Sequence, residues 1–149
     1  LTRRHKNDLE SGIERMVQDA KVVPLAEVVR SAIEHNVRAH LIDPVLHRVL
    51  SEEVPRLGAF DWESDFEKRA EARVKAALEA RRSEIAIPDI DLAVFMLTRT
   101  VEAIVHDGVS ERLQDLKSGA LTEELTRMIV GYLTGKPIAL KKPVRVAAE

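Results

Sequence analysis

The chain has 149 residues, of which 23 are basic and 25 acidic, and it contains no cysteine. This length fits one domain with a core that is stable without disulfides, and because the charges nearly balance, the summed electrostatic field neither recruits nucleic acid nor repels it strongly. The lack of cysteine excludes disulfide and thiolate chemistry. Together with a polar start that is unlike a signal peptide, it leads us to expect a cytoplasmic protein.

The first two predicted helices are amphipathic. Apolar residues recur at helical spacing between positions 9 and 20, after a polar start. We therefore expect residues 1–20 to form a connector helix to a domain upstream, with ordinary fraying of the terminus as the alternative. Pro24 suits the first position of the second helix, which runs to about residue 41. Its predicted buried side consists of Leu25, Val28, Val29, Ala32, Ile33, Val37 and Leu41.

Two further helices follow. Asp43 and Pro44 give a cap and first-turn signal for a helix that continues to about residue 54 and ends at Pro55. A long helix is predicted over about residues 61–84, with dense charge on one side. Its other side carries Trp62, Phe66, Ala70, Val74, Ala77 and Leu78.

The last third of the chain carries two more helices. Asp89 or Asp91 opens a helix over residues 92–105 that is apolar almost all round. It is too short to span a bilayer, so we predict burial in protein. One or two helical turns are predicted over residues 110–117. The final helix, residues 125–133, is expected to be capped by Thr122 and stopped by Gly135.

The pattern as a whole predicts an all-α fold, a bundle of about six helices in one domain over residues 1–135. Residues 136–149 have no period and are expected to form a flexible tail. The two late helices carry more apolar surface than a small domain covers easily, so we expect a second copy of the chain to cover it as a homodimer. The predicted interface residues are Val94, Leu97, Val101, Ile104, Val105, Leu125, Met128, Ile129, Tyr132 and Leu133.

Polar residues interrupt several of the predicted apolar faces. Asn36 and His40 lie on the second helix, His47 on the third and Arg99 on the fifth. Burying such a group unpaired costs about 1–3 kcal/mol, whereas several that converge in an aliphatic interior are typical of a small-molecule pocket. The predicted ligand-binding residues are Asn36, His40, His47, Phe66, Phe95, Met96 and Arg99.

The alternative is that each polar group is satisfied separately. Arg99 would then pair with Glu102, the histidines would lie at the surface, and a backbone carbonyl would satisfy Asn36. We favour this interpretation for any single residue, and the pocket for at least two of them together.

Catalytic patterns are weak, and we do not expect an enzyme. The sequence has no cysteine nucleophile, no glycine-rich phosphate loop and no Glu-x-x-His pair of the kind used by helical di-metal sites. His35, His40 and His47 are spaced by five and seven residues, which does not bring neighbouring histidines onto one helical face. No metal and no cofactor are expected.

Two segments carry a resemblance to a known family. Residues 38–55 read RAHLIDPVLHRVLSEEVP, with an Asp-Pro start and a Glu-x-Pro finish to a short helix, and residues 121–133 read LTEELTRMIVGYL. With the helices in this order, residues 1–135 resemble the C-terminal ligand-binding and dimerisation domain of bacterial TetR-family transcriptional regulators.

The resemblance implies a homodimer in which the last two helices of each subunit form a four-helix bundle. It also implies a pocket among the preceding helices and the 92–105 helix. Operator DNA would be bound only through an N-terminal helix-turn-helix domain that these residues lack.

We therefore expect an effector-sensing domain, with repression as the expected sense. A small, largely apolar ligand would shift the connector helix and so control DNA binding. The alternative is a ligand-free helical module for protein–protein assembly.

Overall fold

The computed structural model describes residues 23–43, 45 and 62–135, with side chains in the last range from residue 68 onward. These residues form an all-helical fold, which confirms the predicted fold class. The elements are α2 (Leu25–Leu41), α4 (Trp62–Ala80), the 3-10 helix η2 (Arg82–Glu84), α5 (Ile90–Glu111), α6 (Leu113–Ser118) and α7 (Ala120–Thr134). The predicted connector helix and the predicted tail lie outside the described residues, as does the predicted helix from Asp43 to residue 54 apart from positions 43 and 45.

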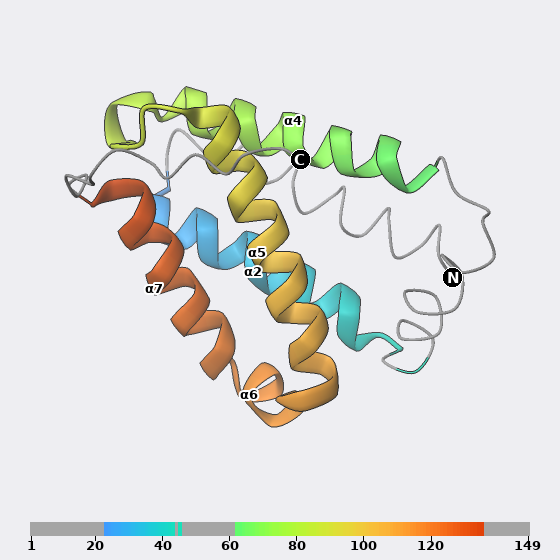
Figure 1. Cartoon of the computed structure of the whole chain (residues 1–149). Helices are drawn as coiled ribbons and strands as arrows, with labels where there is room; N and C mark the ends of the chain where they lie inside the picture. The colour runs from blue at the N-terminus through green and yellow to red at the C-terminus, as the bar shows by residue number, and fades with distance from the viewer. Residues whose placement is uncertain (1–22, 44, 46–61, 136–149) are drawn as a thin grey trace, which may run out of the picture.

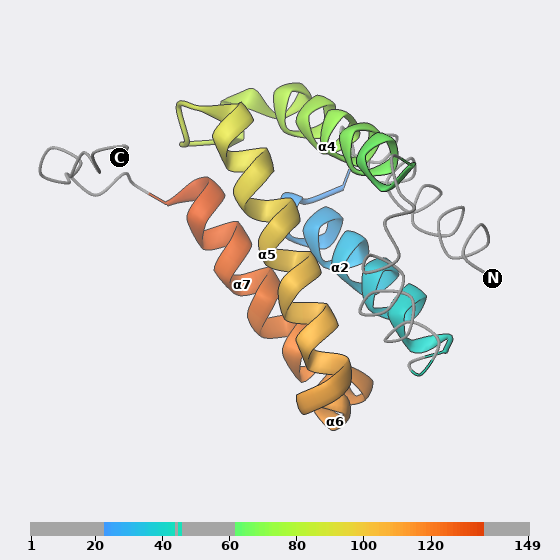
Figure 2. The same ribbon diagram turned by 45° about the vertical axis from the view of Figure 1, so that its right-hand side comes forward.

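Helices α2, α5 and α7 form the body of the bundle. Helix α4 crosses one end, α5 runs away from it, and α7 lies beside α5 after the short turn through α6 (Figure 1). Helix α2 contacts both α5 and α7; it passes behind α5 in Figure 1 and lies to the right of α5 in the rotated view (Figure 2). Helix α4 contacts α5, so α5 packs against α4 as well as against α2 and α7.

The core lies where α2 meets α5 and α7. The predicted apolar side of α2 is confirmed, since Val28, Ile33 and Val37 are buried and Leu41 is partly buried. Burial of such side chains stabilises the fold by about 1.5–3 kcal/mol each. Outside α2, the residues of the buried hydrophobic cluster are Leu78, Ile85, Ile90, Val94, Val105, Leu116, Leu125, Ile129 and Leu133.

Two polar contacts tie the segment after α4 to the rest of the bundle. The guanidinium of Arg81, which is buried, donates to the carbonyl of Val23 just before α2 and to Glu84. The backbone N–H of Ala86 donates to the carbonyl of Leu133 over 2.7 Å. The ends of α2, α4 and α7 therefore meet at one end of the molecule.

The helix bounds differ from the sequence prediction on both sides of this junction. Helix α4 ends at Ala80, earlier than predicted, because Arg81 leaves the helical conformation and a 3-10 turn follows. Helix α5 is longer than predicted and runs through Gly108 to Glu111. A Cβ at Gly108 would lie 3.1 Å from Leu116 and 3.3 Å from Leu121, so glycine lets α6 and α7 pack closely there.

The helix caps are partly as predicted. Asp89 caps α5, since its carboxylate accepts from the backbone N–H of Leu92 over 2.9 Å. The prediction that Thr122 caps α7 is wrong: the helix begins at Ala120, and Thr122 is buried inside it. Gly119 directly precedes α7, and its φ of 83° is a left-handed conformation that favours glycine. The predicted stop at Gly135 is confirmed.

No helix in the described part of the chain is long and apolar enough to cross a membrane.

Candidate effector site and subunit face

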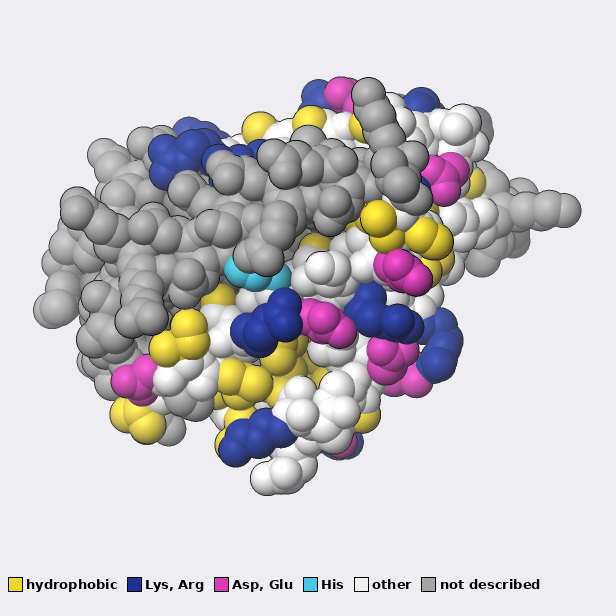
Figure 3. Space-filling model, turned by 180° about the vertical axis from the view of Figure 1, so that it is seen from behind, with side chains coloured by type: hydrophobic (Ala, Val, Ile, Leu, Met, Phe, Trp, Pro, Cys, Tyr) yellow, Lys and Arg dark blue, Asp and Glu magenta, His cyan; other side chains and the backbone are white. Residues whose placement is uncertain are grey.

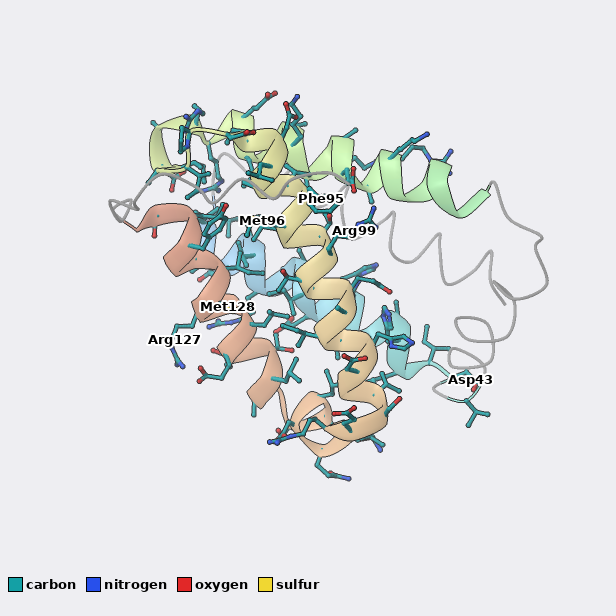
Figure 4. All side chains as sticks on the ribbon, viewed as in Figure 1. Asp43, Phe95, Met96, Arg99, Arg127 and Met128 are labelled. Carbon is teal, nitrogen blue, oxygen red and sulfur yellow. The ribbon has the colours of Figure 1, made fainter. Side chains whose placement is uncertain are left out.

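One side of α5 carries a row of three residues that face α2 and α4. Phe95, Arg99 and Glu102 follow each other at i, i+4 and i+7, so they lie along one stripe of the helix. Phe95 and Arg99 project from α5 away from α7, whereas Met96 lies on the side toward α7 (Figure 4).

At the Glu102 end of this row, hydrogen bonds join α5 to α2. The Nε2 atom of His40 lies 3.0 Å from Oε1 of Glu102, and its Nδ1 atom lies 2.8 Å from the backbone carbonyl oxygen of Asn36. A carboxylate and a carbonyl both accept hydrogen bonds, so both contacts are made when the imidazole carries a proton on each nitrogen. The geometry therefore favours a charged imidazolium.

His40 is only 1% exposed, so its charge is held inside the protein. Burial lowers the pKa of His40, but the hydrogen bond and charge of Glu102 and the bond to the Asn36 carbonyl outweigh it and raise the pKa above the ordinary value of 6.5. Glu102 itself remains half exposed. The pair therefore joins a buried cation to a carboxylate that reaches the surface.

Asn36 is the third member of this contact. Its Nδ2 donates to Oε2 of Glu102 over 3.3 Å, so both oxygens of the carboxylate accept from α2. Its own Oδ1 is buried and has no hydrogen-bond partner among the described residues. An amide oxygen in this position can accept from a hydroxyl or N–H group.

At the other end of the row, Arg99 joins α5 to α4. Arg99 Nη2 donates to Oε1 of Glu71 over 3.3 Å, and its guanidinium carbon lies 5.6 Å from the centroid of the Phe95 ring. This distance is that of a cation–π contact. Phe95 is 53% exposed, so much of its ring is available as an apolar surface.

Four of the seven predicted ligand-binding residues take part in these contacts, Asn36 and His40 at Glu102, and Phe95 with Arg99 about one turn away on α5. Met96 lies on the other side of α5, beside Tyr132, because successive helical residues differ by about 100° in direction. His47 and the side chain of Phe66 lie outside what the structure describes.

The described partners of these polar groups differ from those that the alternative named. Arg99 forms an ion pair with Glu71 on another helix. His40 is buried, and the amide of Asn36 donates to a carboxylate. The choice between a pocket and separate satisfaction of each group stays a prediction.

Two acidic residues of this site were missed by the sequence analysis. Glu102 was considered only as a local partner for Arg99, and Glu71 only as part of a solvated face. The one available signal was that Glu102 interrupts a nearly uncharged helix. A charge there requires a partner or solvent, and a partner on another helix has no sequence pattern.

In the part of the chain that the structure describes, no group of three or more His, Asp or Glu side chains could hold a metal ion. On the rear face, basic and acidic side chains lie next to one another with hydrophobic side chains between them (Figure 3).

The predicted interface residues divide into two groups. Five are buried in the core of the single chain and have little area left to bury against a partner: Val94, Val105, Leu125, Ile129 and Leu133. These five therefore belong to the core of the single chain, which a helical wheel does not distinguish from a side that faces a partner, and their place in a subunit interface stays a prediction. The others are partly buried or exposed: Leu97, Val101, Ile104, Met128 and Tyr132.

Apolar side chains of α5 and α7 remain exposed outside this core. Leu92 is 53%, Met96 45% and Met128 49% exposed. The hydroxyl of Tyr132 lies 3.9 Å from the sulfur of Met96, which brings the apolar sides of the two helices together. We call Leu92, Met96, Met128 and Tyr132 the α5–α7 patch.

A family model matches most of the chain. No curated protein and no solved structure matches the chain. The family model described as "Tetracyclin repressor-like, C-terminal domain" matches residues 24–133, which span the fold from the start of α2 almost to the end of α7. Together with the all-helical fold, this match shows that the chain belongs to the family of TetR-like C-terminal domains.

Proposed function

We propose that this chain is the effector-sensing and dimerisation domain of a TetR-like transcriptional repressor that binds a small, largely apolar ligand among α2, α4 and α5. DNA binding belongs to a helix-turn-helix domain upstream of these residues, and the cytoplasmic location expected from the sequence is part of the same proposal. Family membership supports the general role, since such domains belong to regulators and not to enzymes.

The observation that carries the ligand proposal is the row on α5. It places the exposed ring of Phe95 beside the guanidinium of Arg99, one turn from the contact of Glu102 with α2. Small-molecule sites combine apolar surface with a few placed polar groups. An apolar ligand would pack on the ring, and a polar atom on it would contact Arg99 or the amide oxygen of Asn36.

Switching requires that the ligand bind one arrangement of the helices better than another. The contact of His40 and Asn36 with Glu102 fixes how α2 lies against α5. A ligand that favoured a different arrangement of α2 and α5 would move α2 and, through it, the connector helix predicted over residues 1–20. The separation of two DNA-binding heads would then change.

The homodimer belongs to the same proposal. The exposed residues of the α5–α7 patch, with the partly buried Leu97, Val101 and Ile104, would pair with the same surface of a second chain. A two-fold interface uses the same surface on both subunits.

A thermal-shift screen of the 149-residue chain against a chemically broad panel of small apolar compounds tests the ligand proposal. A compound that binds only the folded chain raises its stability by about 2.7 kcal/mol at a hundredfold excess over its dissociation constant. A saturable shift would support the sensor. No response across the panel would favour the ligand-free assembly module.

Two alanine variants show where a compound binds. Arg99→Ala removes the ion pair with Glu71, and Lys75→Ala removes the other described ion pair between α4 and α5, that of Lys75 with Asp91 at 2.7 Å. We expect Arg99→Ala to weaken binding and Lys75→Ala to leave it unchanged, with the dimer intact in both. Equal binding by the two variants would remove Arg99 from the site.

A further inference from the structure

The glycines of the described helices and caps have different reasons for being glycine. Gly108 lies against Leu116 and Leu121, where a Cβ would be crowded. Gly119 has a left-handed backbone, and at Gly135 a Cβ would lie 2.5 Å from the carbonyl oxygen of Gly131. In each case the chain's own structure accounts for the residue.

Gly131 has no such reason among the described residues. It lies inside α7, is exposed and has no left-handed backbone. A Cβ built on it meets no described atom within 4 Å. Glycine inside a helix costs about 1 kcal/mol relative to alanine, and here no contact within the described chain compensates for that cost.

The surroundings of Gly131 are those of a surface that another helix could cover. Met128, one turn earlier, is half exposed, and the neighbouring Tyr132 contacts Met96 of α5. The labelled Met96 and Met128 project from neighbouring helices (Figure 4). Without a side chain at Gly131, the backbone of α7 is open to close approach at the edge of these apolar residues.

The charges beside Gly131 suit a second copy of this chain. Glu124 and Arg127 lie seven and four residues earlier, on the same side of α7, and they pair with each other. A two-fold axis brings a surface against itself, so a rim of one sign would repel its own copy. A rim with one carboxylate and one guanidinium is neutral and can pair with its own symmetry mate.

We propose that Gly131 is the point at which α7 closely approaches a helix of the second subunit, so that the size of this residue limits how near the two subunits come. The distance between packed helices depends on the side chains at their contact. This inference rests on the homodimer proposed above and goes further by assigning its point of closest approach.

Sedimentation of the 149-residue chain over a range of concentrations tests the inference with three variants. Gly131→Leu and Gly131→Ala add a large and a small side chain to the point of contact. Ala76→Leu is the control, because it adds a leucine to an exposed position of α4. Circular dichroism checks that all three keep their helix content.

We expect Gly131→Leu to raise the dimer dissociation constant by about ten- to a hundredfold, the range that overpacking a close contact gives. Gly131→Ala should raise it less, while the melting temperature of the monomer rises because alanine is the better helix former. A monomer that becomes more stable while the dimer becomes weaker indicates that the added methyl group lies in a close contact between subunits. Ala76→Leu should leave the dissociation constant unchanged.

Two failures would be distinguishable. If the unsubstituted chain stays monomeric at high concentration, the proposed homodimer is refuted and this inference with it. If that chain dimerises and Gly131→Leu dimerises as tightly, only the role of Gly131 is overturned, and the proposed function stands with another point of contact.

Discussion

The two sides of α5 make different kinds of contact with the rest of the chain. Beside the apolar core that it shares with α2, α5 makes polar and directional contacts with α2 and α4, through Glu102 with His40 and through Arg99 with Glu71. Toward α7 the surface is apolar, and Met96 meets Tyr132 through a sulfur contact. Hydrogen bonds and ion pairs fix one arrangement of the helices, because breaking them leaves buried polar groups without partners at a cost in free energy. An apolar surface, in contrast, can be covered by any partner of complementary shape. The proposed ligand and the proposed second subunit would therefore use different sides of the same helix.

The largest expected effect separates the inner and outer sides of α7. Leu133 is 1% exposed and Met128 49%. Leu133→Ala leaves a cavity in the core and should lower the free energy of unfolding by about 2–5 kcal/mol. Met128→Ala should change the stability of the monomer by no more than about 0.5 kcal/mol, as exposed substitutions do.

Chemical denaturation at low protein concentration, where the monomer predominates, measures both values. The division between core and surface would be refuted if the two substitutions cost the same.

A smaller effect is expected from the polar side of α5. Glu102→Gln leaves the buried imidazole of His40 without a carboxylate, and the free energy of unfolding should fall by about 1–2 kcal/mol. This is less than for a fully buried pair because Glu102 is half exposed. Urea unfolding at pH 6, where His40 is charged, measures the loss.

Glu123→Gln is the matched control. Glu123 is also half exposed and pairs with Arg30 across α2 and α7, but its partner is half exposed too. We expect a change of less than about 1 kcal/mol. A loss as large as that of Glu102→Gln would mean that burial of the cation does not matter.

The smallest expected effect is on pH dependence, because titration removes one proton and no side chain. The pKa of His40 is raised above 6.5 in the folded chain, so the folded state holds the proton more tightly than the unfolded state. The stability that His40 contributes is fully present below about pH 6.5 and is lost as the pH rises through the folded-state pKa.

The difference in unfolding free energy between the unsubstituted chain and His40→Gln should therefore decrease from pH 6 to pH 9. Subtracting the variant removes the contributions of the other titratable groups. A difference that stays constant, or grows with pH, would show that the imidazole is neutral in the folded chain.

The local features of the sequence predicted most of the helices. Periodicity gave the buried side of α2, and the carboxylate of Asp89 marked the start of α5. The sequence pattern did not predict that α5 continues through Gly108, because the reason for that glycine is the packing of α6 and α7 against it. The cap of α7 was misplaced because threonine can cap a helix or lie buried within one.

The site was predicted only in part, for a related reason. Asn36 and His40 were identified because they interrupt an apolar stripe, but Glu102 and Glu71 were not, since each has a plausible partner close in sequence. Which carboxylate meets which cation depends on how α2 and α4 cross α5.

The sequence by itself determined where helices form and which of their residues are apolar, because periodicity and capping are properties of short segments. Only the tertiary structure decided which apolar side faces the chain's own core and which remains exposed. Leu133 and Met128 belong to the same amphipathic pattern, yet one is buried and the other is half exposed. The physical reason is that burial depends on neighbours brought together by the fold, and α2 covers the inner side of α7 while leaving its outer side open.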